Sequence, residues 1–285
     1  MNKTLLNLSG KIDPSVINAL LEITKIAVKL NLAFFIVGAT ARDIVMEYVH
    51  NIKAPRMTKD IDIAVCVANW SEYKALTDEL VATGEFLKLT QKRRYGFDGV
   101  LIDIIPFGDI SRPDNKIRWP PYYDIVMSTI GFDDVYETAI IFRLNNDPGL
   151  DIKVPTIPGL AILKLIAWNE AYPIRKKDAE DLLFIMRAYQ HAGIEDRLYD
   201  QETRLLMEEE FDNERSGIRL LGRDMARISN ADTANTIKEI LDLETGKKSN
   251  YRLVSQMGNI SDDPDNIMFI LEKLKQGFIE GIGFY

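Results

Sequence analysis

Strand and helix patterns alternate along the first 157 residues of this 285-residue chain, and strand patterns nearly disappear after Pro158. Before Pro158, short apolar runs such as AFFIVG and GVLIDIIPF have the length of buried strands and lie between segments with helical spacing. After Pro158, segments such as GLAILKLIAWNEA and NIMFILEKLKQGFIEGI repeat apolar residues at helical spacing. We therefore predict an α+β chain, with an α/β core over residues 1–157 and an all-helical part over residues 158–285.

Three aspartates interrupt the predicted strands. Asp60 and Asp62 are two positions apart in KDIDIAVCV, so their side chains point to the same face of the strand. Asp103 is the only polar side chain of VLIDII in the next apolar strand. A buried carboxylate needs a positive partner, and three carboxylates on neighbouring strands supply the oxygen ligands that two Mg²⁺ ions require. We predict that these aspartates bind the metal ions of a catalytic site, and that mutual repulsion makes Asp103→Asn harmless without metal.

A candidate phosphate-binding turn lies about 20 residues before the paired aspartates. In FFIVGATARD, Gly38 ends a predicted strand and Thr40 begins a helix. Exposed amides at the start of a helix, next to a turn without bulky side chains, suit a triphosphate. Many α/β proteins contain such a turn, so the aspartates that follow it are what favour nucleotide binding.

Composition excludes several classes of protein. The longest apolar runs are far shorter than the roughly 20 residues that cross a membrane, and the N-terminus lacks a signal-peptide pattern. We therefore expect a cytoplasmic protein with no membrane partner. A single cysteine and two histidines argue against a cysteine-cluster metal site and a histidine triad. The net charge of −8 argues against a general nucleic-acid coat but allows a local basic surface.

These motifs resemble those of a known family. Glycine with a small residue, then Asp-x-Asp, then a third Asp between aliphatic residues is similar to the DNA polymerase β-type nucleotidyltransferases. WPPYYDIVMSTIGFDDVYETA, VPTIPGLAILKLIAW and IRKKDAEDLLFIM resemble the AbiEii-type nucleotidyltransferases, the toxin class of type IV toxin–antitoxin systems, over about residues 30–190. The resemblance implies a polymerase β-like core, a mixed sheet with flanking helices, and an enzyme of the EC 2.7.7 type. It also implies two Mg²⁺ ions, an NTP substrate, an RNA acceptor such as tRNA and an antitoxin protein as partner.

The same resemblance implies a set of nucleotide-binding residues. Lys164 and Lys177 would lie over the triphosphate, with neighbouring aspartates orienting them. The alternative is that Lys164 snorkels from an apolar helix and that the other charges form surface ion pairs. Ala39 replaces a second glycine of the family pattern and would be strained if its backbone needed a positive φ. The predicted set is Gly38, Ala39, Thr40, Arg42, Lys59, Lys164, Lys177, Asp178 and Asp181.

Basic and aromatic residues flank the Asp103 strand and are candidates for binding the acceptor. Arg93 and Arg94 precede the strand, and Arg118 and Trp119 lie in the loop after it. Trp119 could stack on an unpaired terminal base. The alternative is that the Trp119-Pro120-Pro121 segment packs the loop onto the helical half.

The predicted function is Mg²⁺-dependent transfer of NMP from an NTP to a hydroxyl acceptor, with the tRNA 3′ end as the leading acceptor and a toxin as the biological role. One alternative is a CCA-adding-like or small-molecule nucleotidyltransferase, since GATARD is similar to the CCA-adding enzymes although their Glu-Asp-x-x-Arg motif is not evident. Two other classes are a non-catalytic nucleotide- or partner-binding protein and a metal-dependent phosphodiesterase. Retention of three carboxylates argues against the first, and the lack of histidine near the acidic strands argues against the second.

Overall fold

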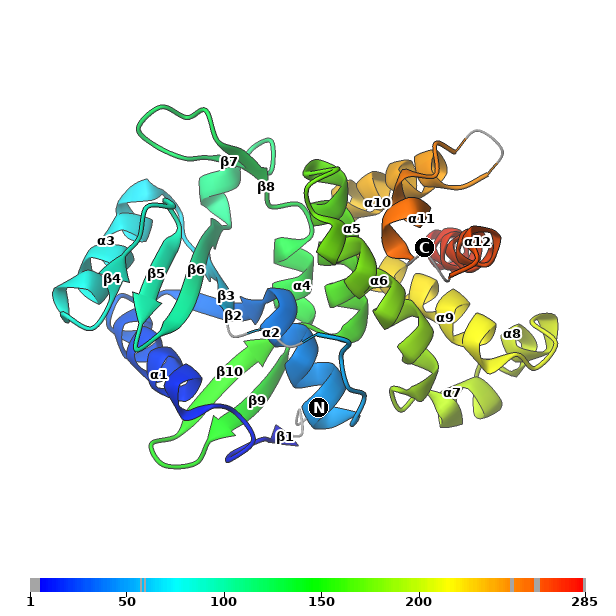
Figure 1. Cartoon of the computed structure of the whole chain (residues 1–285), viewed down its shortest axis with the longest axis horizontal. Coiled ribbons are helices and arrows are strands. Elements are labelled where there is room, and N and C mark those ends of the chain that lie inside the picture. The colour runs from blue at the N-terminus through cyan, green and yellow to red at the C-terminus, as the bar shows by residue number, and fades with distance from the viewer. Residues whose placement is uncertain (1–5, 57, 59, 247–248, 259–261, 284–285) are drawn as a thin grey trace. The chain divides into compact units, whose positions relative to one another are not determined.

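The structure of the chain is a computed structural model that describes residues 6–56, 58, 60–246, 249–258 and 262–283 (Figure 1). The chain divides into two compact units. The first unit comprises Met1–Val49 and Lys53–Thr156, and the second comprises His50–Ile52 and Ile157–Tyr285. The sequence put the division between residues 157 and 158.

The first unit is built on an eight-stranded sheet, and its mixed strand directions confirm the mixed sheet that the resemblance implied. Its strand order is β1-β9-β10-β2-β3-β6-β5-β4. At the centre, β3 runs parallel to β6, whereas β2 and β5 are antiparallel to their inner neighbours β3 and β6. The strands are β1 (Leu6–Asn7), β2 (Ala33–Val37), β3 (Ile61–Cys66), β4 (Leu87–Lys88), β5 (Arg94–Phe97), β6 (Val100–Phe107), β9 (Ile140–Asn145) and β10 (Leu150–Val154).

Helices flank this sheet, and a small hairpin extends from it (Figure 1). Capping residues fix where the two long helices start: Asp13 accepts a hydrogen bond from the amide of Ser15 before α1, and Asn69 does the same for α3. The helices are α1 (Pro14–Lys29), α2 (Gly38–Asp43), the π-helical η1 (Ile44–Val49), α3 (Trp70–Ala82), the 3₁₀ turn η2 (Asp109–Ser111) and α4 (Phe132–Thr138). The hairpin consists of β7 (Lys116–Arg118) and β8 (Val126–Ser128).

The second unit is helical, and its described residues contain no strand, which confirms the predicted all-helical C-terminal part. No described helix is long and apolar enough to cross a membrane. The helices are α5 (Ile157–Glu170), α6 (Lys176–Ala188), η3 (Tyr189–His191), α7 (Glu195–Asp200), α8 (Thr203–Glu208), α9 (Asn213–Ile228), α10 (Ala231–Glu244), α11 (Arg252–Met257) and α12 (Pro264–Ile282).

Glycines let the backbones of α9 and α12 touch. A Cβ atom on Gly277 of α12 would lie 1.8 Å from the carbonyl oxygen of Arg219, and one on Gly222 of α9 would lie 2.2 Å from the carbonyl oxygen of Leu274. No side chain fits at such distances, so the small residues set the spacing of the two helices.

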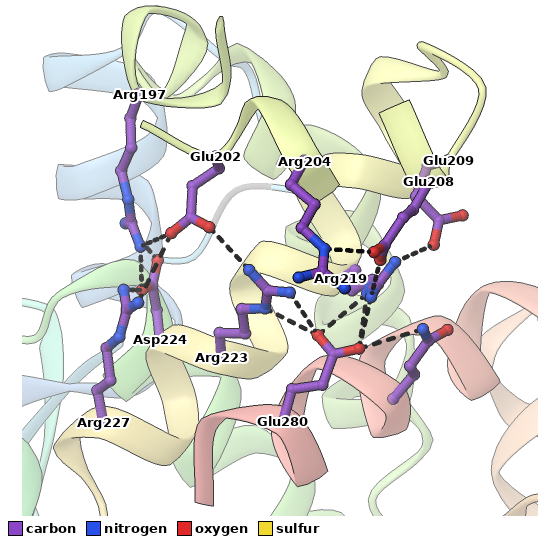
Figure 2. A network of polar contacts seen from close by, with 11 residues as sticks. Arg197, Glu202, Arg204, Glu208, Glu209, Arg219, Arg223, Asp224, Arg227 and Glu280 are labelled. Carbon is purple, nitrogen blue, oxygen red and sulfur yellow. Dashed lines mark hydrogen bonds and ion pairs between the residues drawn. The ribbon is translucent and has the colours of Figure 1, made fainter. Parts of the chain in front are cut away.

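Ion pairs cross the same contact (Figure 2). Arg219 is 4% exposed and donates to Glu280 of α12 at 2.6 Å, to Glu208 at 2.7 Å and to Glu209 at 2.9 Å. Arg223 pairs with Glu280 from the next turn of α9. The network therefore joins α8, α9 and α12, and it supports the helical unit rather than a site, because its buried charges are satisfied by one another.

Candidate active site

Two of the predicted carboxylates face each other across the centre of the sheet. In the parallel pairing of β3 with β6, Asp62 is the register partner of Asp103. In the antiparallel pairing of β6 with β5, Asp103 is in turn the partner of Arg94. Register partners project from the same face of a sheet, so Asp62, Asp103 and Arg94 form one row across three strands. We call this row, together with the adjacent Asp60, the carboxylate row. Asp60 directly precedes β3, with its side chain 45% exposed.

Two arginines neutralise the buried member of this row. The side chain of Asp103 is only 6% exposed; it accepts hydrogen bonds from Arg94 at 2.7 Å and 3.0 Å and from Arg93 at 3.1 Å. Burial alone would raise the pKa of Asp103, but these hydrogen bonds and charges outweigh it and leave the pKa below its usual value. Arg94 also approaches Asp60, at 4.0 Å. Arg93 and Arg94, which were predicted to bind the acceptor, thus form ion pairs with Asp103. Because these pairs compensate the charge of Asp103, repulsion among the three carboxylates no longer predicts that Asp103→Asn is harmless.

The Gly38 turn is fitted directly against Asp62. Gly38 has a φ of +69°, and a Cβ atom there would lie 2.1 Å from a carboxylate oxygen of Asp62. Only glycine therefore combines this backbone conformation with the approach of the turn to the carboxylate. Thr40 ties the same turn to the other aspartate, because its hydroxyl donates to the backbone carbonyl oxygen of Asp60 at 2.6 Å. The predicted phosphate turn and the paired aspartates are thus one local structure.

The other predicted residues near this turn have different surroundings. Ala39 lies within α2 and has no positive φ, so the strain that its methyl group would have caused does not arise. Arg42 is fully buried and donates to Asp43 at 2.6 Å and to the carbonyl oxygen of Arg56 at 2.8 Å. That burial fits a structural role better than contact with a nucleotide. Lys59 lies outside the described residues.

A second charged cluster lies in the helical unit. Lys164 of α5 is 6% exposed, and its ammonium group lies 2.8 Å from Asp178 and 2.7 Å from Asp181 of α6. Arg175 also pairs with Asp178. The snorkelling alternative is wrong, because the ammonium group is buried among carboxylates instead of extending to solvent. Lys177 is exposed on α6.

The carboxylate oxygens of this row are suitable ligands for a divalent cation. Carboxylate oxygens are the ligands that Mg²⁺ prefers, and Asp62 and Asp103 are adjacent across the sheet. In the present conformation, no three acidic, histidine or cysteine side chains among the described residues are grouped to hold a metal ion. The guanidinium of Arg94, between Asp103 and Asp60, supplies positive charge to the row instead.

The aromatic residue predicted to bind the acceptor is buried. Trp119 is 3% exposed, and its ring packs against those of Trp70 at 5.2 Å and Tyr73 at 5.6 Å. These contacts are with α3 in the first unit and leave no open ring face for a nucleobase. Arg118 forms an exposed ion pair with Asp114 at 2.5 Å. Neither residue makes a described direct contact with Asp60, Asp62 or Asp103.

The role of Arg94 was missed at the sequence level, although a signal for it exists. Asp98 and Gly99 both have positive φ and join β5 to β6 as a two-residue hairpin. Asp-Gly between two apolar runs is a strong indicator of such a turn. Counting back from the pair Phe97–Val100 places Arg94 opposite Asp103.

Comparison with known proteins gives one family and several distant structures. The model of the family described as "Nucleotidyl transferase AbiEii toxin, Type IV TA system" matches residues 20–246. None of the curated proteins searched matches the chain. The antibiotic-resistance factor ANT(2'')-Ia in solution is 14% identical, with 70% of this chain and 98% of that chain covered and a TM-score of 0.37. A CCA-adding enzyme with ATP is 16% identical, with coverages of 96% and 70% and a TM-score of 0.33. The Thermotoga maritima CCA-adding enzyme complexed with tRNA is 15% identical, with coverages of 96% and 83% and a TM-score of 0.27.

Proposed function

Because the chain belongs to the AbiEii family of nucleotidyltransferase toxins, we propose that it transfers NMP from an NTP to a hydroxyl group of RNA, with Mg²⁺. The observation that supports the site most strongly is the register pairing of Asp62 with Asp103 beside the Gly38 turn. A structural role alone does not require a glycine that fits tightly against a carboxylate at the end of a buried strand. A nucleotide site would use such a turn, because free backbone amides at the start of a helix bind phosphate beside the carboxylates proposed to hold the cation.

The reaction forms one bond and breaks one. An oxygen of the acceptor attacks the α-phosphorus of the NTP, the bond from that phosphorus to the oxygen of the β-phosphate breaks, and pyrophosphate leaves with the electron pair. Bound magnesium would stabilise the attacking and leaving oxygens. Asp60 and Asp62 would hold the nucleotide-bound ion, and Asp103 would complete the second ion site once Arg93 and Arg94 release it. The hydroxyl proton would pass to water or to Asp103.

The triphosphate has two proposed contacts in the chain. Gly38 lies against Asp62, and the amides of the Gly38–Thr40 turn would bind phosphate oxygens. Lys164 and Lys177 are also proposed to bind phosphate oxygens, with Asp178 and Asp181 fixing the direction of the Lys164 ammonium. We further propose that the protein acts in the cytoplasm as the toxin of a toxin–antitoxin pair, with a tRNA 3′ end as the acceptor.

The test is a transfer assay in which the acceptor is not chosen in advance. Purified protein is incubated with each of four α-³²P-labelled NTPs, Mg²⁺ and total cellular RNA, and the products are separated on a denaturing gel. We expect label from one or two NTPs to appear on RNA of tRNA size, and EDTA to abolish it. Label that appears only on small molecules or on protein would replace RNA as the acceptor. Absence of any labelled product in a whole-cell extract would contradict the proposed transfer.

A further inference from the structure

Four large apolar side chains are exposed within five residues of the loop and strand that follow Trp119. Tyr122 is 81% exposed, Tyr123 54%, Ile125 47% and Val126 51%. They lie at the tip of the β7–β8 hairpin, which projects from the sheet (Figure 1). Exposed side chains of this size gathered in one place are typical of binding surfaces. We call residues 122–126 the hairpin tip.

The base of the hairpin is fixed close to the carboxylate row. Trp119 packs on Tyr73 of α3, and the hydroxyl of Tyr73 donates to the carbonyl oxygen of Ile104 at 3.0 Å. Ile104 directly follows Asp103 in β6. Within the loop, the amide of Tyr123 donates to the carbonyl oxygen of Trp119 at 3.0 Å. These contacts tie the base of the hairpin to the strand that carries Asp103.

A line of cations joins the row to the tip. Arg93 donates to Asp103 at 3.1 Å, and the next residue back, Lys92, places its ammonium group 5.9 Å from the ring centroid of Tyr122. Lys92 also donates to the carbonyl oxygen of Trp119 at 3.4 Å and lies 3.8 Å from Asp124. The segment 86–130 contains seven lysines and arginines against five aspartates, whereas the whole chain has a net charge of −8. Two cations, Arg93 and Lys92, therefore lie between Asp103 and the tip.

We propose that the hairpin tip binds the unpaired 3′ end of the acceptor RNA, with a nucleobase stacked on Tyr122, another on Tyr123, and the intervening phosphate at Lys92. Exposed aromatic faces beside cations are what single-stranded RNA requires, because each base has a face to stack and each linkage has a charge to neutralise. An end held there leads along Lys92 and Arg93 toward Asp103, where its hydroxyl group must react. This inference rests on the proposed transfer to RNA.

The binding test measures fluorescence anisotropy of a 3′-unpaired RNA oligonucleotide of about twelve nucleotides and of the same strand in a blunt duplex. Stacking on one aromatic side chain predicts that Tyr122→Ala and Tyr123→Ala each weaken binding of the unpaired strand by about tenfold. Tyr122→Phe, which keeps the ring, should bind as the wild type does. Asp124→Asn, which frees Lys92 from its ion pair, should bind RNA more tightly. The control is Tyr199→Ala, an exposed tyrosine (52%) of α7 in the helical unit.

Each other outcome overturns the inference. The inference is wrong if both tyrosine variants bind RNA as the wild type does, or if Tyr199→Ala weakens binding equally. It is also wrong if the wild type binds the blunt duplex as tightly as the unpaired strand. A loss with Ile125→Ser but not with Tyr122→Ala would indicate an apolar protein-docking surface instead. Calorimetry with NTP and Mg²⁺ separates this failure from failure of the proposed function. Tyrosine variants should keep the NTP affinity of the wild type. If the wild type transfers NMP to RNA and the tyrosine variants bind RNA equally well, only the hairpin-tip inference is wrong.

Discussion

Replacing Asp103 by asparagine tests whether this carboxylate is an integral part of the metal-free fold. Asp103 accepts three hydrogen bonds from Arg93 and Arg94 and is 6% exposed, so its charge is compensated almost entirely by those two side chains. Loss of one partner from a fully buried ion pair costs about 3–5 kcal/mol. The arginine side chains are 39% and 25% exposed and regain water, and asparagine keeps one acceptor oxygen. We therefore expect a smaller loss, about 2 kcal/mol of unfolding free energy.

The assay is differential scanning calorimetry of the metal-free protein in EDTA. At about 2–4 °C per kcal/mol for a domain of this size, Asp103→Asn should lower the Tm of the first unit by roughly 4–8 °C. Asp147→Asn, at an exposed turn residue of the same unit, is the matched control and should change the Tm by less than about 1 °C. Arg94→Gln should give a loss similar to that of Asp103→Asn, and the double variant less than the sum. An unchanged or raised Tm for Asp103→Asn would show that the pairing contributes nothing and that carboxylate repulsion dominates.

Three further changes test other contacts. Gly38→Ala should destabilise the first unit by about 1–3 kcal/mol in chemical denaturation and reduce transfer sharply, because the new Cβ displaces Asp62; full activity would refute the tight fit. Arg219→Leu should cost about 3–5 kcal/mol in the helical unit, since Glu208, Glu209 and Glu280 all lose the arginine between them, and a loss below about 1 kcal/mol measured by urea unfolding would contradict the network's importance. Lys164→Met should weaken NTP binding in calorimetry at least tenfold, and unchanged affinity would return Lys164 to a purely structural role.

Much of the fold follows from patterns that are local in sequence. The strands AFFIV and IDIAVC carry the length and apolar content of buried strands, and helices such as α9 and α12 carry helical spacing. YETAIIFRL as a whole has the apolar content of a strand, but α4 continues to Thr138 and β9 begins only at Ile140. A short amphipathic turn of helix and a short strand have similar apolar content, so pattern alone does not separate them.

The site was predictable to the extent that it depends on alternation along single strands. Asp60 and Asp62 were found that way, and the lone Asp103 stood out among aliphatic neighbours. What alternation does not supply is the pairing register between strands that are far apart in sequence. That register places both Asp62 and Arg94 beside Asp103. Arg93 and Arg94, which were predicted to bind the acceptor, therefore form ion pairs with Asp103. Burial is equally non-local: nothing in WPPYY distinguishes the ring that becomes 3% exposed from those that stay open.

The central claim is that the carboxylate row carries nucleotide transfer, and the transfer assay with Asp62→Asn tests it most directly. Asp62 is the register partner of Asp103 and the residue against which Gly38 fits, so loss of its charge removes a cation ligand with little change in shape. Wild type, Asp62→Asn and Asp147→Asn are compared at equal concentration with labelled NTP, Mg²⁺ and RNA. Melting curves recorded beforehand establish that each variant is folded at the assay temperature. We predict that Asp147→Asn transfers label as the wild type does, whereas Asp62→Asn loses at least about a thousandfold in rate, of the order seen when a key charge is removed from an active site. Transfer by a folded Asp62→Asn within tenfold of the wild-type rate would contradict the account.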